Sequence, residues 1–221
     1  IANNSTAPGA ECFAFNEMFP GGFTPKFGGE LHDVSGVAGV RGDLGSGFRY
    51  DLSASVGQNQ VDFFIKNTVN ATLGPNTPTS FKPGSYIQRE KQFNFDVSYP
   101  LPLELFASPL NIAAGLERRE EEFQIKKGDL ASYAIGPLAS QGFGIGSNGF
   151  SGFSPDVAGT FNRWNDAIYL DLETDITKDF LFGLAGRWED FEDFGSTANG
   201  KVSMRYNIDQ NFAVRSTAST G

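Results

Sequence analysis

The sequence predicts an all-β fold, an antiparallel up-and-down meander of about eight strands. Apolar and polar residues alternate with a period of two in several separate segments, as in strands with one buried or lipid-covered face. The composition agrees, because Gly 27 and Phe 22 among 221 residues suit strands and turns better than helices. All eleven prolines (Pro 11) fall outside the alternating segments, as expected since proline removes a ladder donor.

Each predicted strand is one segment of alternation, and the clearest begins at Phe48. There, Phe48, Tyr50 and Leu52 alternate with Arg49 and Asp51. No segment shows a convincing helical period. With a weaker first strand included, the predicted strands are residues 31–41, 48–56, 93–99, 110–117, 168–173, 180–187, 201–206 and 212–219.

The predicted connections alternate between short and long. Short turns are expected at residues 42–47, 174–179 and 207–211, with a longer one at 100–109. Long loops are expected near residues 61–89 and 120–162, with a shorter one at 190–199, and residues 1–30 are expected to form an extracellular loop. Long loops are uncommon in compact domains, but transmembrane β-barrels have short turns on one side and long loops on the other.

Aromatic residues strengthen the membrane interpretation. They stand at strand ends beside the short turns, on the apolar face, where a membrane barrel has its aromatic girdle: Phe48, Tyr99, Phe180, Tyr206 and Phe212. The apolar runs are too short for a transmembrane helix, which needs about 20 residues. The sequence therefore predicts the strands of a transmembrane β-barrel in an outer membrane, in contact with its lipid.

The polar positions of the same strands are candidates for lining the lumen. Charge on the lipid side costs about 2–4 kcal/mol at the membrane midplane, so mixed charge is expected on the other face. The alternative is a cross-strand network that only solvates the wall. The candidates are Arg49, Asp51, Asp96, Glu117, Asp171, Glu173, Arg187, Glu189, Lys201, Arg205 and Arg215.

The loop near residues 120–162 is rich in Gly and Phe. Residues 144–149 match the glycine pattern of dinucleotide-binding loops, but no helix or βαβ unit is predicted around them. We interpret the segment as a flexible loop whose Phe143, Phe150 and Phe153 are candidate ligand contacts.

Several kinds of chemistry are disfavoured. The net charge of -9, without a basic cluster, argues against a nucleic-acid partner. His32 is the only histidine, which removes most triad, acid–base and zinc schemes, so we expect no enzyme, metal or cofactor. The acidic residues Glu189, Asp190, Glu192 and Asp193 are expected in a solvated loop. Cys12 is alone, either unpaired or paired with a cysteine upstream.

Several segments resemble the barrel domain of TonB-dependent outer-membrane receptors. They are NTVNATLGPNTPTSF (67–81), NIAAGLERRE (111–120), SYAIGP (132–137), AIYLDLE (167–173), AGRWEDFEDFGS (185–196) and the final residues 201–221. The resemblance covers roughly residues 44–221, and rests on the order and spacing of the segments.

This resemblance implies the middle portion of a large barrel, without plug or C-terminal strands. In the family, a plug domain and the remaining strands complete a receptor that imports a scarce nutrient with energy from the TonB complex. The ligand would be an iron–siderophore, cobalamin or an oligosaccharide. Two alternatives stay open: a small autonomous eight-stranded outer-membrane barrel acting as an adhesin or structural protein, and a soluble ligand-binding β-domain.

Overall fold

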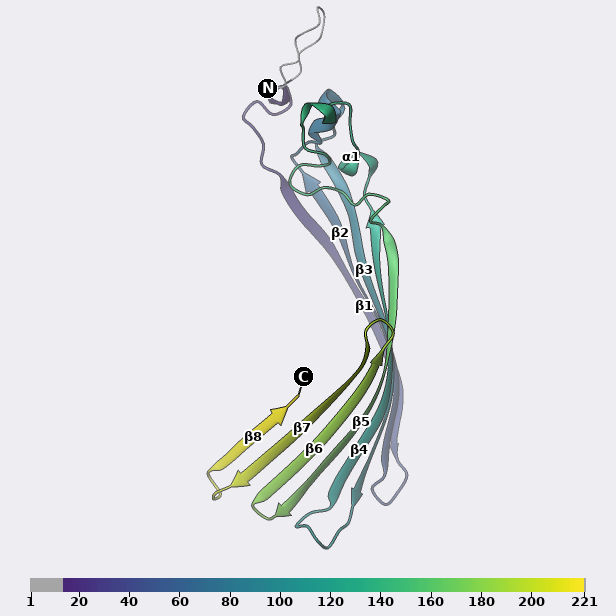
Figure 1. The fold of residues 1–221 in the computed structure, drawn as a ribbon, viewed down its shortest axis with the longest axis vertical. Coiled ribbons are helices and arrows are strands. Elements are labelled where there is room, and N and C mark those ends of the chain that lie inside the picture. The colour runs from purple at the N-terminus through teal and green to yellow at the C-terminus, as the bar shows by residue number, and fades with distance from the viewer. Residues whose placement is uncertain (1–13, 221) are drawn as a thin grey trace, which may run out of the picture. The chain divides into compact units, whose positions relative to one another are not determined.

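The computed structural model describes residues 14–220, which form one antiparallel sheet with strands in chain order (Figure 1). The predicted all-β meander is confirmed. The strands are β1 (Lys26–Asp43), β2 (Arg49–Lys66), β3 (Ser80–Leu101), β4 (Leu110–Lys127), β5 (Gly159–Thr177), β6 (Phe180–Phe191), β7 (Gly195–Asn207) and β8 (Ala213–Ser219).

The strands are longer than predicted, so several predicted loop boundaries are wrong. β1 starts at Lys26, within the loop expected at residues 1–30. The loops expected near 61–89 and 120–162 are residues 67–79 and 128–158. In β2 the apolar residues are even-numbered up to Val56, as at Leu52, and odd-numbered later, as at Phe63. The period-two alternation therefore breaks near Gly57, although the strand itself continues to Lys66.

The connection predicted at residues 190–199 is only the turn 192–194, between β6 and β7. Glu189 and Asp190 therefore lie in β6 rather than in a solvated loop, whereas Glu192 and Asp193 lie in the turn. Cys12 and the first part of the predicted extracellular loop lie outside the described residues.

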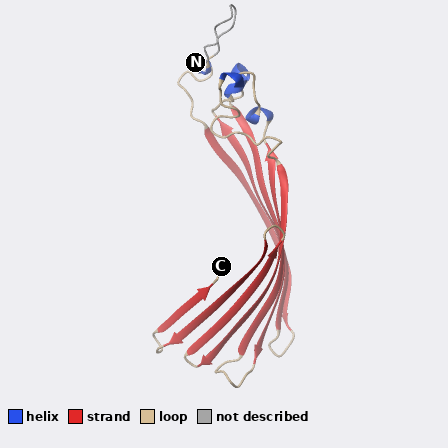
Figure 2. Cartoon of the chain, in the orientation of Figure 1, coloured by secondary structure: helices blue, strands red, loops and turns tan. Residues whose placement is uncertain are grey.

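Short helices, which the sequence did not predict, lie before β1, between β2 and β3, and between β4 and β5 (Figure 2). They are η1 (Phe15–Glu17), η2 (Ala71–Asn76), α1 (Leu130–Tyr133) and η3 (Ala139–Gln141). No helix among residues 14–220 has the length and apolar character to cross a bilayer.

The chain divides into two compact units, each described by itself. The loop unit contains the described residues of 14–34 together with 58–88 and 122–161. The sheet unit contains residues 35–57, 89–121 and 162–220. Strands β1 to β5 contribute to both units.

The loop unit has a partly polar core. Ile65, Val69 and Phe81 are buried in it. Asn70, which is fully buried, donates two hydrogen bonds of 2.9 Å to the carbonyl oxygens of Ala131 and Ala134. Its own Oδ1 accepts from the Thr72 hydroxyl at 2.7 Å. Buried polar groups need partners, and here one asparagine links the two long loops.

In the sheet unit, the pairing of β5 to β8 determines which residues lie side by side. Leu172 faces Leu184, Leu184 faces Val202, and Val202 faces Ala218. One residue away along each strand, Asp171 faces Ala185, which faces Lys201. Since directly opposite residues share a face, β5–β8 have one apolar and one polar side.

Candidate functional site

The polar face of the sheet unit carries the predicted lumen-lining residues. The register from β5 to β8 places the following on one face: Asp171, Glu173, Arg187, Glu189, Lys201, Arg205 and Arg215. Glu117 joins them through an ion pair of 3.3 Å with Arg187. Asp96 joins them through its hydrogen bond with Tyr169, which faces Arg187. That this shared face lines a lumen stays a prediction.

The densest group on this face surrounds Arg187. Its Nη2 lies 2.9 Å from Glu189 Oε1 and 3.3 Å from Glu117 Oε1. Asn165 Nδ2 donates to the same Glu189 oxygen at 3.1 Å. Asn165 Oδ1 is buried with no hydrogen-bond partner. The group links β4, β5 and β6, which is the geometry of a cross-strand network in the wall.

A second polar group forms where Tyr169 crosses the neighbouring strand. The Tyr169 hydroxyl donates to Asp96 Oδ1 at 2.6 Å, from β5 to β3. Gly115 of β4 makes this possible, since a Cβ there would lie 2.3 Å from the Tyr169 ring. A side chain at residue 115 would occupy the space of the ring and the carboxylate.

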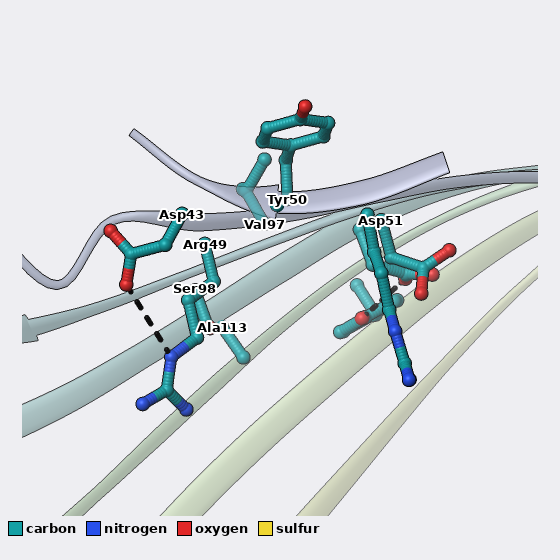
Figure 3. Close-up of a pocket in the computed structure, with 11 residues that line it drawn as sticks. Asp43, Arg49, Tyr50, Asp51, Val97, Ser98 and Ala113 are labelled. Atoms are coloured by element: carbon teal, nitrogen blue, oxygen red, sulfur yellow. Dashed lines mark hydrogen bonds and ion pairs between the residues drawn. The ribbon is translucent and has the colours of Figure 1, made fainter. Parts of the chain in front are cut away.

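A cavity of about 530 Å³ opens beside this hydrogen bond (Figure 3). Arg49, Asp51 and Asp96 line it together with Tyr169. Arg49 lies 4.0 Å from Asp43, the pair that the dashed line marks. The structure therefore brings together sequence candidates from β2 and β3, in a cavity of mixed charge that no local motif indicated.

The opposite face exposes large apolar side chains. Leu184 is 46% exposed, Met204 41% and Val214 57%, in adjacent strands. Isolated exposed apolar residues are ordinary, but a contiguous face of them marks a surface that another apolar phase covers. Two of the predicted aromatic residues lie on this face at the short-turn end: Phe180 is opposite Tyr206, which is opposite Val214. Phe48 and Phe212 lie in the turns just before β2 and β8.

The other end of the apolar face has its own border. Trp188 lies opposite Ile168 and is the last large apolar residue of β6 on this face. On β5, beyond Ile168, Asp166 accepts two hydrogen bonds from Arg118, at 2.9 and 3.1 Å. The Arg118 guanidinium also lies 4.9 Å from the centre of the Trp164 ring. Tryptophan followed by charge is typical of the edge of a membrane-facing band.

The loop unit contains an aromatic cluster that includes two predicted ligand contacts. Phe63 lies near Phe27, Phe150 and Phe153, with ring centres 5.6, 5.4 and 6.1 Å away. Tyr86 stacks on Phe153 at 4.9 Å. Phe150 and Phe153 thus anchor the long loop to the strands.

Phe143 lies apart from this cluster, 6.3 Å from Phe15. Glycines 146 and 149, in the segment that matches a dinucleotide loop, have positive φ angles of 79° and 97°. The segment leads into irregular loop and then β5, so the helix that such a site needs does not follow. A ligand role for the three phenylalanines stays a prediction.

His32 takes part in a small polar group in the loop unit. His32 Nε2 lies 3.8 Å from Asp62, whose carboxylate also accepts from the Ser85 hydroxyl. That hydrogen bond is the main reason why the pKa of Asp62 lies below its usual value. Because Ser85 donates to the carboxylate rather than to the histidine, the three residues lack the geometry of a nucleophilic triad. Within residues 14–220 no group of three His, Cys, Asp or Glu could hold a metal ion.

A meander of long strands with one exposed apolar face and one polar face is typical of the wall of a transmembrane β-barrel. A family model described as "TonB dependent receptor-like, beta-barrel" matches residues 13–221. The chain therefore belongs to the TonB-dependent receptor β-barrel family, as the sequence resemblance predicted. Members of this family are outer-membrane transporters, not enzymes.

Solved structures agree on the fold. The siderophore receptor PirA from Acinetobacter baumannii is similar to this chain, with 16% sequence identity and a TM-score of 0.58. The match covers 86% of this chain and 25% of the PirA chain. The RagAB peptide transporter is 17% identical to this chain, with a TM-score of 0.56. The match covers 93% of this chain and 23% of the transporter chain. The chain thus spans about a quarter of the length of these structures. Comparison with curated protein sequences gives no match.

Proposed function

We propose that this chain forms part of the wall of an outer-membrane receptor that imports a scarce nutrient. The observation that carries the proposal is the division of β5–β8 into two faces. Even-numbered Leu184, Val202 and Met204 contact lipid, and odd-numbered Arg187, Lys201 and Ser203 face the lumen. With this arrangement no charged residue of these rows faces lipid, where it would lower the stability of the barrel.

The ends of the strands set the orientation. Short turns such as 44–48 and 178–179 face the periplasm, and the long loops 67–79 and 128–158 face outward. Barrels of this kind have short periplasmic turns and longer extracellular loops, which supports the assignment. The loop unit then takes part in the first contact with the ligand, and Phe143 is one candidate residue.

The partners follow from the family. We propose that a plug domain and further strands complete the receptor, that outer-membrane lipid surrounds it, and that the TonB complex supplies energy indirectly. An iron–siderophore, cobalamin or an oligosaccharide are the nutrient classes we favour. The similar solved proteins are described as a siderophore receptor and a peptide transporter, and those descriptions apply to them.

The alternatives have less support. An autonomous eight-stranded barrel needs its first and last strands to pair, and no ladder joins β8 to β1 in the described part of the chain. A soluble β-domain needs a second layer over its apolar face, yet Leu184 and Val214 are about half exposed there.

Site-directed spin labelling tests the two faces. Single cysteines replace Leu184, Met204, Ser53 and Ser203 in the full receptor, free of native cysteines and reconstituted in bilayers. Labels at Leu184 and Met204 should be more accessible to oxygen, which concentrates in lipid. Labels at Ser53 and Ser203 should be more accessible to a polar nickel chelate.

The matched pair Ser203 and Met204 is the sharpest comparison, because the two residues are neighbours on one strand. If both labels prefer the nickel chelate, the lipid-facing assignment fails. If their preferences are exchanged, the faces are inverted.

A further inference from the structure

The apolar face of the sheet unit ends at a line of charged residues that crosses four neighbouring strands. On each of β3, β4, β5 and β6, an exposed apolar side chain is followed by a charged one, two residues nearer the end that carries the long loops. Residues two apart in a strand share a face, so the charges continue the apolar face. In strand order the pairs are Phe93 and Lys91, Leu116 and Arg118, Ile168 and Asp166, and Trp188 and Asp190. We call the four charged residues the charged border.

Ion pairs join the charged border across three strands. Glu120 lies between its two cations, with Oε2 3.8 Å from Lys91 Nζ and Oε1 3.9 Å from Arg118 Nε. On the other side, Arg118 Nη1 donates to both carboxylate oxygens of Asp166, at 2.9 and 3.1 Å. The carboxylates therefore fix the positions of both cations on this face.

Both cations keep hydrogen-bond donors for an acceptor outside the chain. A guanidinium group carries five N–H donors and an ammonium group three. The two atoms of Glu120 lie beyond hydrogen-bond distance from Lys91 and Arg118, so this pairing uses none of those donors. The side chain of Lys91 is 72% exposed and that of Arg118 is 49% exposed. An anionic group next to this face can therefore reach them.

Both tryptophans of the chain lie at the charged border. The Arg118 guanidinium lies 4.9 Å from the centre of the Trp164 ring, and Trp164 shares a face of β5 with Asp166. Trp188 of β6 is opposite Ile168. Tryptophan is enriched where a bilayer meets water, because its ring is apolar and its N–H is polar. This enrichment indicates lipid headgroups at the border.

The length of β6 agrees with this position. Phe180, at the short-turn end, and Trp188 lie on the same face of β6. At about 3.4 Å per residue they are separated by about 27 Å of strand. With the usual strand tilt of about 35–45°, this length gives about 20 Å along the membrane normal, close to the apolar band of about 25 Å in transmembrane barrels. The charged border therefore begins where the hydrocarbon ends.

We propose that Lys91 and Arg118 bind the phosphate groups of lipid headgroups at the loop end of the apolar band. The inference rests on the proposed function, which assigns the apolar face to lipid. Phosphate oxygens accept strong, charge-assisted hydrogen bonds from ammonium and guanidinium groups. Lipid is the occupant that fits, because the charged border continues the apolar face without a break on four strands.

Native mass spectrometry of the full receptor in detergent tests the proposal. Phosphatidylglycerol is titrated in, and the amounts of lipid-bound receptor give the Kd. Diacylglycerol with the same acyl chains but no phosphate is the matched lipid. The test variant combines Lys91→Gln with Arg118→Gln. The control is Arg119→Gln, which removes the same charge from the next residue of β4, on the opposite face. Exposed ion pairs contribute little to stability, so these variants should fold.

The double variant should raise the Kd for phosphatidylglycerol by about tenfold or more, the loss expected for hydrogen bonds to a charged group. The Kd for diacylglycerol should stay unchanged, and Arg119→Gln should bind both lipids like wild type. Equal phosphatidylglycerol binding by wild type and the double variant would overturn the proposal. So would an equal loss for diacylglycerol, or the same loss in the Arg119 control.

The spin-label comparison of Ser203 with Met204 tests the proposed function separately. If Met204 proves to face lipid while phosphatidylglycerol binding is unchanged in the double variant, only the phosphate site is wrong. If the label at Met204 prefers the nickel chelate, the lipid-facing assignment and this inference are both wrong.

Discussion

Tyr169 of β5 donates a hydrogen bond of 2.6 Å to Asp96 of β3, across the strand that lies between them. The ring passes over Gly115 of β4. Glycine is the only residue type that fits there, because any side chain at this position would block the ring. The contact joins three strands through side chains in addition to their backbone ladders. It also borders the cavity of about 530 Å³ on the polar face, because Tyr169 is part of the cavity lining.

Gly115→Ala should therefore destabilise the sheet unit. The new Cβ would lie 2.3 Å from the Tyr169 ring and 2.4 Å from Asp96 Oδ1, so the hydrogen bond must break or the strand must shift. Overpacking of this kind costs about 1–3 kcal/mol. A lower thermal unfolding temperature of the full receptor would show the effect. Gly186→Ala is the control, because its Cβ would have its nearest neighbour at 4.0 Å. Equal stability of the two variants would contradict the assigned role of Gly115.

The sequence predicts the strands of the sheet unit well and its contacts poorly. Period-two alternation places Lys201 and Val202 on opposite faces, because a strand turns each successive side chain to the other side. The hydrogen bond of Tyr169 with Asp96 joins residues far apart in the chain, and only the three-dimensional register brings them together. Gly115 was one glycine among many in the sequence.

The loop unit was harder to predict for a different reason. Its strands continue with the apolar positions moved from even to odd numbers, as at Leu52 and Phe63, so the alternation breaks inside β2. The loops are held by side-chain hydrogen bonds to backbone carbonyls, as at Asn70, and such bonds leave no periodic pattern. The sequence indicates Phe150 and Phe153 as aromatic residues of the loop, but their packing on Phe63 depends on the path of the loop in space.

Asn70→Asp should loosen both long loops of the loop unit. The carboxylate cannot donate to the Ala131 and Ala134 carbonyls, and it would place like partial charges against them. An unsatisfied buried group costs about 1–3 kcal/mol, and more when it is charged. Hydrogen exchange should speed up at the backbone amides of residues 130–138. Asn76→Asp, an exposed change in the same loop, should leave exchange unchanged. Unaltered protection in the Asn70 variant would show that another contact holds the loops.

Phe63→Ala should release the segment 148–153 from the strands. Phe63 has ring contacts with Phe27, Tyr86, Phe150 and Phe153, and a buried Phe→Ala change costs about 3–5 kcal/mol, less where the ring is only half-buried. Limited proteolysis of intact cells should then cleave the long loop faster. Phe161→Ala, whose side chain is exposed, is the matched control and should be cleaved at the wild-type rate. Equal cleavage of both variants would mean that the aromatic cluster does not anchor the loop.

Ser85→Ala should raise the pKa of Asp62, because the Ser85 hydroxyl is the first cause of its lowered value. A depressed pKa in the folded state gives stability that is present above the usual value of 3.8 and is lost as pH falls through the folded pKa. The variant should therefore show a smaller loss of stability on acidification through this window. Carbon-13 carboxyl NMR of labelled aspartate measures the shift directly. Ser80→Ala, at the exposed start of β3, should leave the titration of Asp62 unchanged.

Leu184→Arg and Ala185→Arg place the same charge on opposite faces of β6. Leu184 lies in the apolar row with Leu172 and Val202, whereas Ala185 lies between Asp171 and Lys201 on the polar face. An arginine facing lipid costs about 2–4 kcal/mol at the midplane, and one facing a wet lumen costs far less. The Leu184 variant should fold into bilayers with lower stability in urea titrations, and the Ala185 variant should stay close to wild type. Equal losses of stability in the two variants would mean that both faces of β6 lie in the same environment. That result would contradict the assignment of one face to lipid and the other to the lumen.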